Sequence, residues 1–114
     1  AAVGLTEEQA KAQGLKVRTS VLEFHWVPRA WLSLDERGLI KMVAEAETGR
    51  ILGVHLVAPH AGELIHEATL AIKHKLTLQD LIETFHVYPT LSEALRIFAQ
   101  GFFKDATKLS CCAE

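Results

Sequence analysis

Two adjacent cysteines, Cys111 and Cys112, stand near the C-terminal end of this 114-residue chain and are its only cysteines. Chain ends are ordinarily exposed, whereas a free cysteine within a fold is ordinarily a small buried apolar residue. Lys104 and Lys108 lie just upstream, and nearby positive charge favours the thiolate, which is the form that attacks and binds metals. Two neighbouring thiolates therefore predict a site for a soft metal ion, whereas a disulfide between them would close a strained ring.

The six histidines do not form a metal-binding pattern. His66 and Glu67 begin like a zinc protease motif, but the second histidine of that motif is missing. We expect structural or solvent-exposed positions for the histidines inside predicted strands, His25 and His55, and for those in loops or at helix ends, His60 and His74. The sequence also lacks a glycine-rich dinucleotide loop and a serine nucleophile elbow.

The run FHVYPTLSE is the second candidate site. Pro89 fixes its own backbone and restricts Tyr88 to an extended conformation. Thr90 or Ser92 can cap the helix that follows, with Glu93 in the first turn, where a carboxylate suits the helix dipole. The rigid turn either aims the Tyr88 side chain outward for a function or is a helix N-terminus with a packed tyrosine. Local chemistry favours the packed tyrosine, because caps are common.

Three stretches predict an antiparallel meander in the first half of the chain. Residues 16–24 are rich in β-branched side chains, and residues 39–46 alternate in polarity. Residues 51–58 are almost continuously apolar, as is typical of a central strand. Pro28 interrupts or edges the stretch 26–34 that lies between the first two strands.

Helical signals precede and follow these strands. A capping box from Thr6 to Gln9 starts a short helix that Gly14 ends. Further helices are predicted at residues 63–75, 78–84 and 91–103. The last helix carries an apolar stripe and, off it, Ile97 and Phe103, so its wider apolar surface fits either core packing or burial against a partner. Strands grouped together with helices after them predict one α+β domain.

Composition excludes several classes of function. A hydrophobic content of 49% is enough for a core, and a net charge of −2 gives no sign of a nucleic-acid-binding surface. Apolar runs are short, and the N-terminal residues lack the pattern of a signal peptide, so we expect neither a membrane span nor secretion. We expect a cytoplasmic protein, where free thiols persist. The missing initiator methionine suggests a fragment of a longer protein.

Three separated segments resemble the C-terminal dimerisation domain of the flavin disulfide reductases. They are VGLTEEQA at residues 3–10, ETGRILGVHLVAPHAGELIHEATLAI at residues 47–72 and YPTLSEAL at residues 88–95. The resemblance implies that residues 1–105 adopt that fold, an antiparallel β-meander packed with helices, and that residues 106–114 form a flexible Cys-Cys tail. It also implies a homodimer, with FAD and NADPH bound by domains outside this chain.

Members of that family usually carry a His-Pro-Thr motif whose histidine is the acid–base group for the partner subunit's redox disulfide. The resemblance places Tyr88 in the position of this histidine and retains Glu93, the residue that orients it. A tyrosine with an ordinary pKa of about 10 is a poor base at neutral pH. The dithiol chemistry of lipoamide dehydrogenase or glutathione reductase is therefore in doubt.

Tyr88 and the KLSCCA ending together resemble the mercuric reductase branch of the family. The resemblance implies that Cys111 and Cys112 capture Hg(II) and pass it to an inner cysteine pair in the partner subunit, where flavin reduced by NADPH converts Hg(II) to Hg(0). Tyr88 would line that inner metal site and Glu93 would support it, in a protein that confers mercury resistance. No role is assigned to His86, and this domain by itself is expected to be inactive.

Two alternatives stay open. The chain could be a non-catalytic soft-metal-binding or interaction module, or the interface domain of another flavin disulfide reductase, against which Tyr88 argues. The ending Ala113-Glu114 carries an acid where mercuric reductases commonly have glycine, and the YPTLSE run is closer to the general family. These departures leave the geometry of the metal site open.

Overall fold

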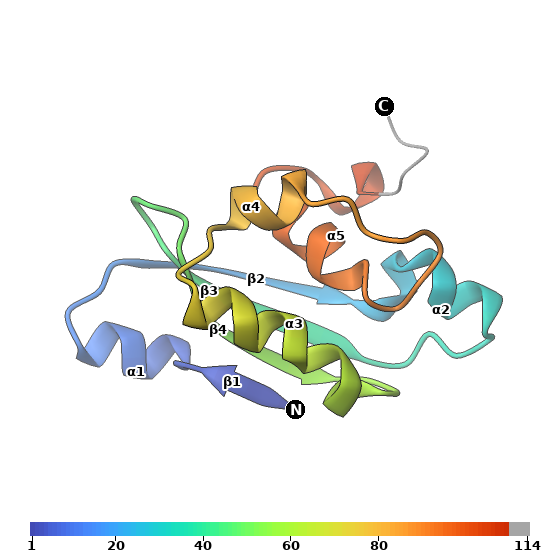
Figure 1. Ribbon diagram of the computed structural model, residues 1–114, viewed down its shortest axis with the longest axis horizontal. Coiled ribbons are helices and arrows are strands. Elements are labelled where there is room, and N and C mark those ends of the chain that lie inside the picture. Colours follow the sequence, from blue (N-terminus) through green and yellow to red (C-terminus); the bar gives the residue numbers. More distant parts are fainter. Residues whose placement is uncertain (110–114) are drawn as a thin grey trace.

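The computed structural model of the chain describes residues 1–109. Its elements follow one another as strand β1 (Ala2–Gly4), helix α1 (Glu7–Ala12), strand β2 (Val17–Glu23), 3₁₀ turn η1 (Phe24–Trp26), helix α2 (Pro28–Leu32), strands β3 (Leu39–Glu45) and β4 (Ile51–Val57), helices α3 (Ala61–Lys73), α4 (Leu78–Glu83) and α5 (Ala94–Gln100), and 3₁₀ turn η2 (Ala106–Lys108). Figure 1 shows α3, α4 and α5 grouped beside the sheet and α1 at one end of it. The predicted α+β class is confirmed.

The four strands form one antiparallel sheet in the order β1-β4-β3-β2. Strands β2, β3 and β4 are the predicted meander, and β4 is central, as its continuous apolar sequence indicates. The sequence did not predict β1, which pairs with β4 from Ala2, opposite His55, to Gly4, opposite Gly53. A three-residue strand carries too short a pattern to be recognised, and its place is fixed by backbone hydrogen bonds to β4.

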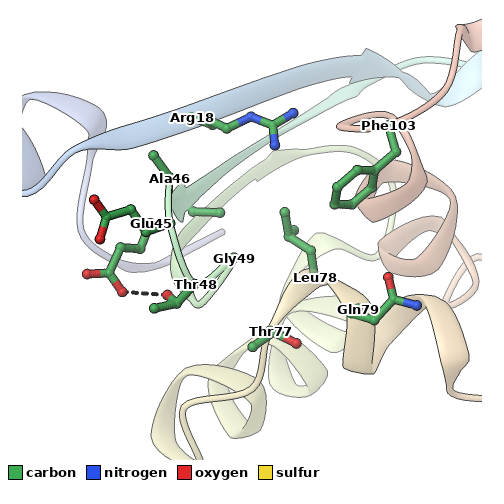
Figure 2. A pocket seen from close by; sticks show the side chains of 11 residues that line it. Arg18, Glu45, Ala46, Thr48, Gly49, Thr77, Leu78, Gln79 and Phe103 are labelled. Carbon is green, nitrogen blue, oxygen red and sulfur yellow. Dashed lines mark hydrogen bonds between the residues drawn. The ribbon is translucent and has the colours of Figure 1, made fainter.

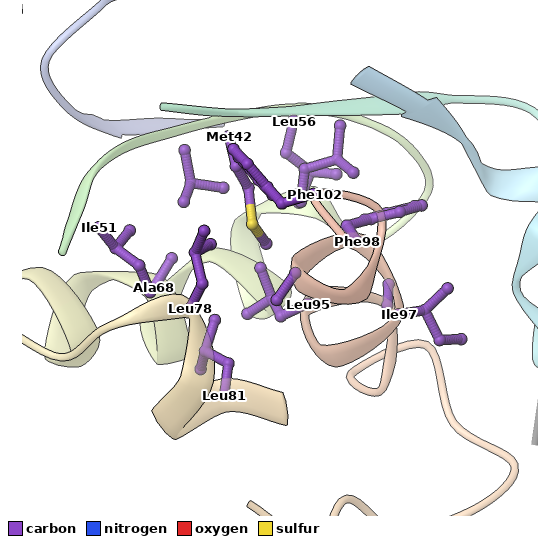
Figure 3. Packing of buried hydrophobic residues seen from close by; sticks show 14 of the residues in the cluster. Met42, Ile51, Leu56, Ala68, Leu78, Leu81, Leu95, Ile97, Phe98 and Phe102 are labelled. Atoms are coloured by element: carbon purple, nitrogen blue, oxygen red, sulfur yellow. The ribbon is translucent and has the colours of Figure 1, made fainter. Parts of the chain in front are cut away.

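One face of the sheet carries the main core. Alternate residues of β3 and β4 turn to this face, as the predicted alternation requires. They meet apolar residues of α3, α4 and α5 between the sheet and the helices (Figure 3). The buried members include Ile40, Met42, Val54, Leu56, Ala68, Ala71, Leu78, Leu81, Leu95 and Phe98. The core therefore lies in a single layer, with the helices on its outer side.

A register shift in the pairing of β3 with β4 places two consecutive side chains of β4 in different apolar clusters. The shift lies between Val43 and Ala44, where Ala44 pairs with Ile51 and leaves Leu52 as the extra residue. Leu52 turns to the opposite face and packs with Val43 and with Ala10 of α1. A bulge of this kind re-aims side chains, so both Ile51 and Leu52 are buried, each on its own side.

Helix α5 is shorter than predicted, because regular helix spans only Ala94–Gln100. Ile97, which lies off the main stripe, is 2% exposed inside the core of this chain, whereas Phe103 is 58% exposed. Core packing therefore explains the wider apolar surface at Ile97.

The region around Pro28 also differs from the expectation of an interrupted or edge strand. Pro28 is the first residue of α2, a position that suits proline because its missing N–H would have no helical partner. His25 accordingly lies in the 3₁₀ turn η1 rather than in a strand. Among residues 1–109, no helix is long and apolar enough to cross a membrane.

Candidate functional site

Tyr88 lies in the loop of residues 84–93 that joins α4 to α5. Helix α4 starts at a capping box: the Thr77 hydroxyl accepts from the Asp80 N–H at 3.2 Å, and the Asp80 carboxylate accepts from the Thr77 N–H at 2.7 Å. The helix ends at Thr84, whose hydroxyl donates back to the Asp80 carbonyl at 2.7 Å. The loop thus leaves a helix that is fixed at both ends.

A reciprocal pair of hydrogen bonds holds the far end of the loop. The Thr90 hydroxyl accepts from the Glu93 N–H at 3.2 Å, and the Glu93 carboxylate accepts from the Thr90 N–H at 3.3 Å. The same hydroxyl donates to the Val87 carbonyl at 2.7 Å. The N-cap residue of α5 is Glu93, and no side-chain hydrogen bond caps this helix, so neither predicted cap forms; Thr90 instead closes the turn that precedes α5.

The Tyr88 side chain lies at the surface and is 54% exposed. Its peptide bond to Pro89 is cis. Phe85 and Val87 in the same loop are 93% and 70% exposed. The exposure agrees with the outward tyrosine rather than with a packed one, and the loop presents an apolar surface around the phenol.

A cavity of about 200 Å³ lies under this loop and brings Tyr88 and Glu93 together. The side chains that line it come from the end of α4, from the loop and from the start of α5: Ile82, Glu83, Thr84, Phe85, His86, Tyr88, Glu93 and Arg96. Glu93 is only 6% exposed, although it carries a carboxyl group. The structure thus places an exposed phenol and a buried carboxyl group at one cavity.

The environment of Glu93 opposes its ionisation. Burial raises the pKa of this carboxyl group, and three groups partly offset the rise: the Thr90 N–H, the Arg96 guanidinium and the His86 ring. Arg96 is held in place because its Nε donates to the Ile82 carbonyl at 3.0 Å. The guanidinium near Glu93 is therefore held in place by a hydrogen bond between the two helices on either side of the loop.

His86 also lines the cavity, and the sequence assigned it no role. Its side chain is 7% exposed; Nε2 lies 2.5 Å from Glu67 Oε1 on α3, and Nδ1 lies 3.0 Å from the Thr84 carbonyl oxygen. Glu67 stands 19 residues earlier in the chain. No local spacing signals such a contact, so only the fold could bring the pair together.

A second cavity, of about 240 Å³, lies at the other end of α4 (Figure 2). Arg18 of β2 lines it, donates from Nη2 to the Phe102 carbonyl at 2.6 Å, and lies 5.7 and 5.5 Å from the ring centres of Phe102 and Phe103. Such cation–π contacts are attractive. Neither Tyr88 nor Glu93 lines this cavity; Arg18 instead holds the segment that follows α5.

That segment leads toward the cysteine pair. Turn η2 is followed by Leu109, which is 2% exposed and belongs to the main core. Lys104 and Lys108, the lysines upstream of the cysteines, are exposed. The predicted metal ligands Cys111 and Cys112 lie outside the described residues.

The described site supplies oxygen ligands rather than a complete metal centre. Tyr88 offers one phenolic oxygen, which can donate or accept a hydrogen bond. Within residues 1–109, no group of three or more His, Cys, Asp or Glu side chains is arranged to hold a metal ion. Soft ligands for a soft ion must therefore come from cysteines outside this part of the chain.

The sequence profile of the pyridine nucleotide-disulphide oxidoreductase dimerisation domain matches residues 1–98. Mercuric reductases from Lysinibacillus sphaericus and Bacillus cereus are 52% and 50% identical over 99% of the chain, which spans only 21% and 18% of their lengths.

Solved structures agree with this assignment. The HOCl-induced flavoprotein disulfide reductase RclA from Escherichia coli matches with a TM-score of 0.81 at 29% identity, over 87% of this chain and 23% of RclA. LpdA from Mycobacterium tuberculosis matches with a TM-score of 0.80 at 31% identity, over 90% of this chain and 22% of LpdA. The resemblance found in the sequence is confirmed: the chain belongs to the dimerisation-domain family of the pyridine nucleotide-disulphide oxidoreductases.

Proposed function

We propose that the chain is the dimerisation and Hg(II)-delivery domain of an NADPH- and FAD-dependent mercuric reductase, which reduces Hg(II) to Hg(0) in the cytoplasm. The observation that carries the proposal is the position of Tyr88: an exposed phenol beside the buried Glu93, at the edge of an apolar loop. Relatives named mercuric reductase, at about 50% identity, support the choice of substrate.

Mercury capture is assigned to Cys111 and Cys112. Hg(II) is a soft ion that prefers a small number of thiolate ligands. Each ligand exchange forms one Hg–S bond and breaks another, and the proton of the entering thiol passes to the thiolate that leaves. Two neighbouring thiols compete well against single small thiols, because the second bond forms within the same molecule.

Tyr88 is assigned to the inner metal site, as an oxygen ligand that this chain lends to the cysteine pair of the partner subunit. Glu93 acts through the backbone: its carboxylate and N–H pair with Thr90, and this fixes the turn that presents the phenol. The exposed Phe85 and Val87 on either side suit burial against a second subunit. A homodimer follows from this assignment, since one chain captures the ion and the other receives it.

FAD and NADPH do not fit the residues of this chain. The sequence has no glycine-rich loop that could hold a pyrophosphate. We assign both cofactors to other domains of a longer enzyme. The residues of this chain therefore bind, transfer and position the metal ion, and they contribute no electrons.

The capture role is tested in the full-length enzyme by replacing both tail cysteines, Cys111→Ala with Cys112→Ala. We expect turnover of Hg(II) bound to bulky thiols to fall at least about tenfold, with the neighbouring Ser110→Ala as the matched control. Unchanged turnover would exclude delivery by the tail. Lipoamide or glutathione disulfide reduction at rates comparable to Hg(II) reduction would instead support another flavin disulfide reductase, and Hg(II) binding without turnover would support a non-catalytic module.

A further inference from the structure

We infer that His86 is a positioning residue of the metal site, which fixes the Tyr88 loop to helix α3 through Glu67. The inference rests on the proposed function for its consequence in the reaction. The geometry on which it depends is independent of the substrate.

The His86 ring is held at both nitrogens. Nε2 lies 2.5 Å from the Glu67 carboxylate and Nδ1 lies 3.0 Å from the carbonyl oxygen of Thr84. Both partners offer acceptor oxygens, and both contacts are within hydrogen-bond distance. Charge-assisted hydrogen bonds of this length are the stronger kind, and here the histidine side chain is almost completely buried.

These contacts join three segments at one side chain. Glu67 belongs to α3, Thr84 ends α4, and His86 itself stands two residues before Tyr88. On the other side of Tyr88, Thr90 is fixed by its bonds to Val87 and Glu93. The backbone that carries the phenol is therefore clamped both before and after it.

The clamp matters because the phenol is largely outside the core. More than half of the Tyr88 side chain is exposed, so core packing contributes little to its position. A metal ligand must be held to within a fraction of an ångström, and a displacement of about 1 Å can cost about a hundredfold in rate. The His86–Glu67 pair adds a fixed point before the phenol to the one that Thr90 forms after it.

The same ring also lines the cavity that the buried Glu93 lines. The His86 ring and the Arg96 guanidinium both lower the pKa of Glu93 against the effect of burial. Arg96 is anchored to α4 and His86 to α3. Without the His86 ring, Arg96 would be the remaining one of these two groups. The pKa of Glu93 would then rise further, and less of the carboxylate that pairs with Thr90 would be present.

The test uses His86→Ala in the full-length enzyme, with the exposed His74→Ala as the matched control. We expect kcat for Hg(II) to fall about tenfold or more, while the KM for NADPH stays within twofold. In a Tyr88→Phe background the same change should have little further effect, because the two residues act as one unit. An equal fall of kcat with and without the tyrosine hydroxyl would overturn the positioning role.

Conservative variants separate the two contacts. His86→Gln keeps a donor that can reach Glu67, and His86→Asn keeps a donor near the Thr84 carbonyl. We expect glutamine to restore more of kcat than asparagine, because the carboxylate contact is the charge-assisted one. If glutamine restores no more of kcat than asparagine, and Glu67→Gln has the kcat of the wild type, the assigned contacts are not the cause.

Hydrogen exchange gives a readout that needs no mercury chemistry. His86→Ala and Glu67→Ala should each accelerate amide exchange of the 84–93 loop by about tenfold, and the double variant should exchange no faster than either. Unchanged exchange in the loop would refute the clamp. If the variants accelerate exchange as expected but the wild-type enzyme does not reduce Hg(II), only the proposed function is refuted.

Discussion

Leu109 offers a direct test of how the segment before the cysteine pair is held. Its side chain is 2% exposed within the main core, whereas the preceding Thr107 and Lys108 are exposed. Leu109→Ala in a core ordinarily costs about 2–5 kcal/mol. Because Leu109 follows a short 3₁₀ turn near the end of the chain, this segment can release locally, so we expect the lower end of that range, about 2 kcal/mol in the free energy of unfolding.

Urea unfolding of the 114-residue chain, followed by the fluorescence of Trp26 and Trp31, measures this loss. Lys108→Ala is the matched control, and we expect it to change stability by less than about 0.5 kcal/mol. Arg18→Ala, which removes the bond to the Phe102 carbonyl, should weaken the same segment, and its effect should not add fully to that of Leu109→Ala. A Leu109→Ala variant as stable as the control would show that the leucine does not anchor the segment.

Two further predictions concern pH. Burial raises the pKa of Glu93 in the folded state, so the folded chain keeps this proton longer than the unfolded chain. The free energy of unfolding should therefore fall as pH rises from about 4.5 through the raised pKa, and Glu93→Gln should remove that slope in urea titrations between pH 4 and 8. Lys11 and Lys41 hold the pKa of Glu7 at about 2; their stabilisation should be lost as pH falls from 4.5 towards 2, and an acid titration in which Glu7→Gln unfolds with the wild-type pH profile would contradict this.

Most of the fold could be predicted because its signals are local. The capping box at Thr6 depends on residues three positions apart, and it forms as the sequence indicates. The alternation of β3 and the continuous apolar run of β4 assign the strands to the middle of the sheet. Strand β1 was missed because its three residues are positioned by backbone pairing with β4, which leaves no mark on side-chain type.

The candidate site could be predicted only in part, for the same reason. Tyr88 and Glu93 were predicted from a family pattern and a helix start, both of which are contiguous in the chain. His86 was not assigned, because its partner Glu67 lies on another helix 19 residues away. Helix α5 is also shorter than the predicted 91–103, since regular helix spans only Ala94–Gln100.

The arrangement of the site explains why a dimer is needed for the proposed reaction. Three polar side chains at the cavity beside Tyr88 are already engaged: His86 with Glu67, Arg96 with the Ile82 carbonyl, and Glu93 with Thr90. They can hold the phenol in place, but the soft ligands that Hg(II) requires are not among residues 1–109. An exposed oxygen ligand on a rigid loop, flanked by exposed apolar side chains, is complete only when another subunit brings its thiols to it. Loosening the loop should therefore impair the reaction even when both cysteine pairs are intact.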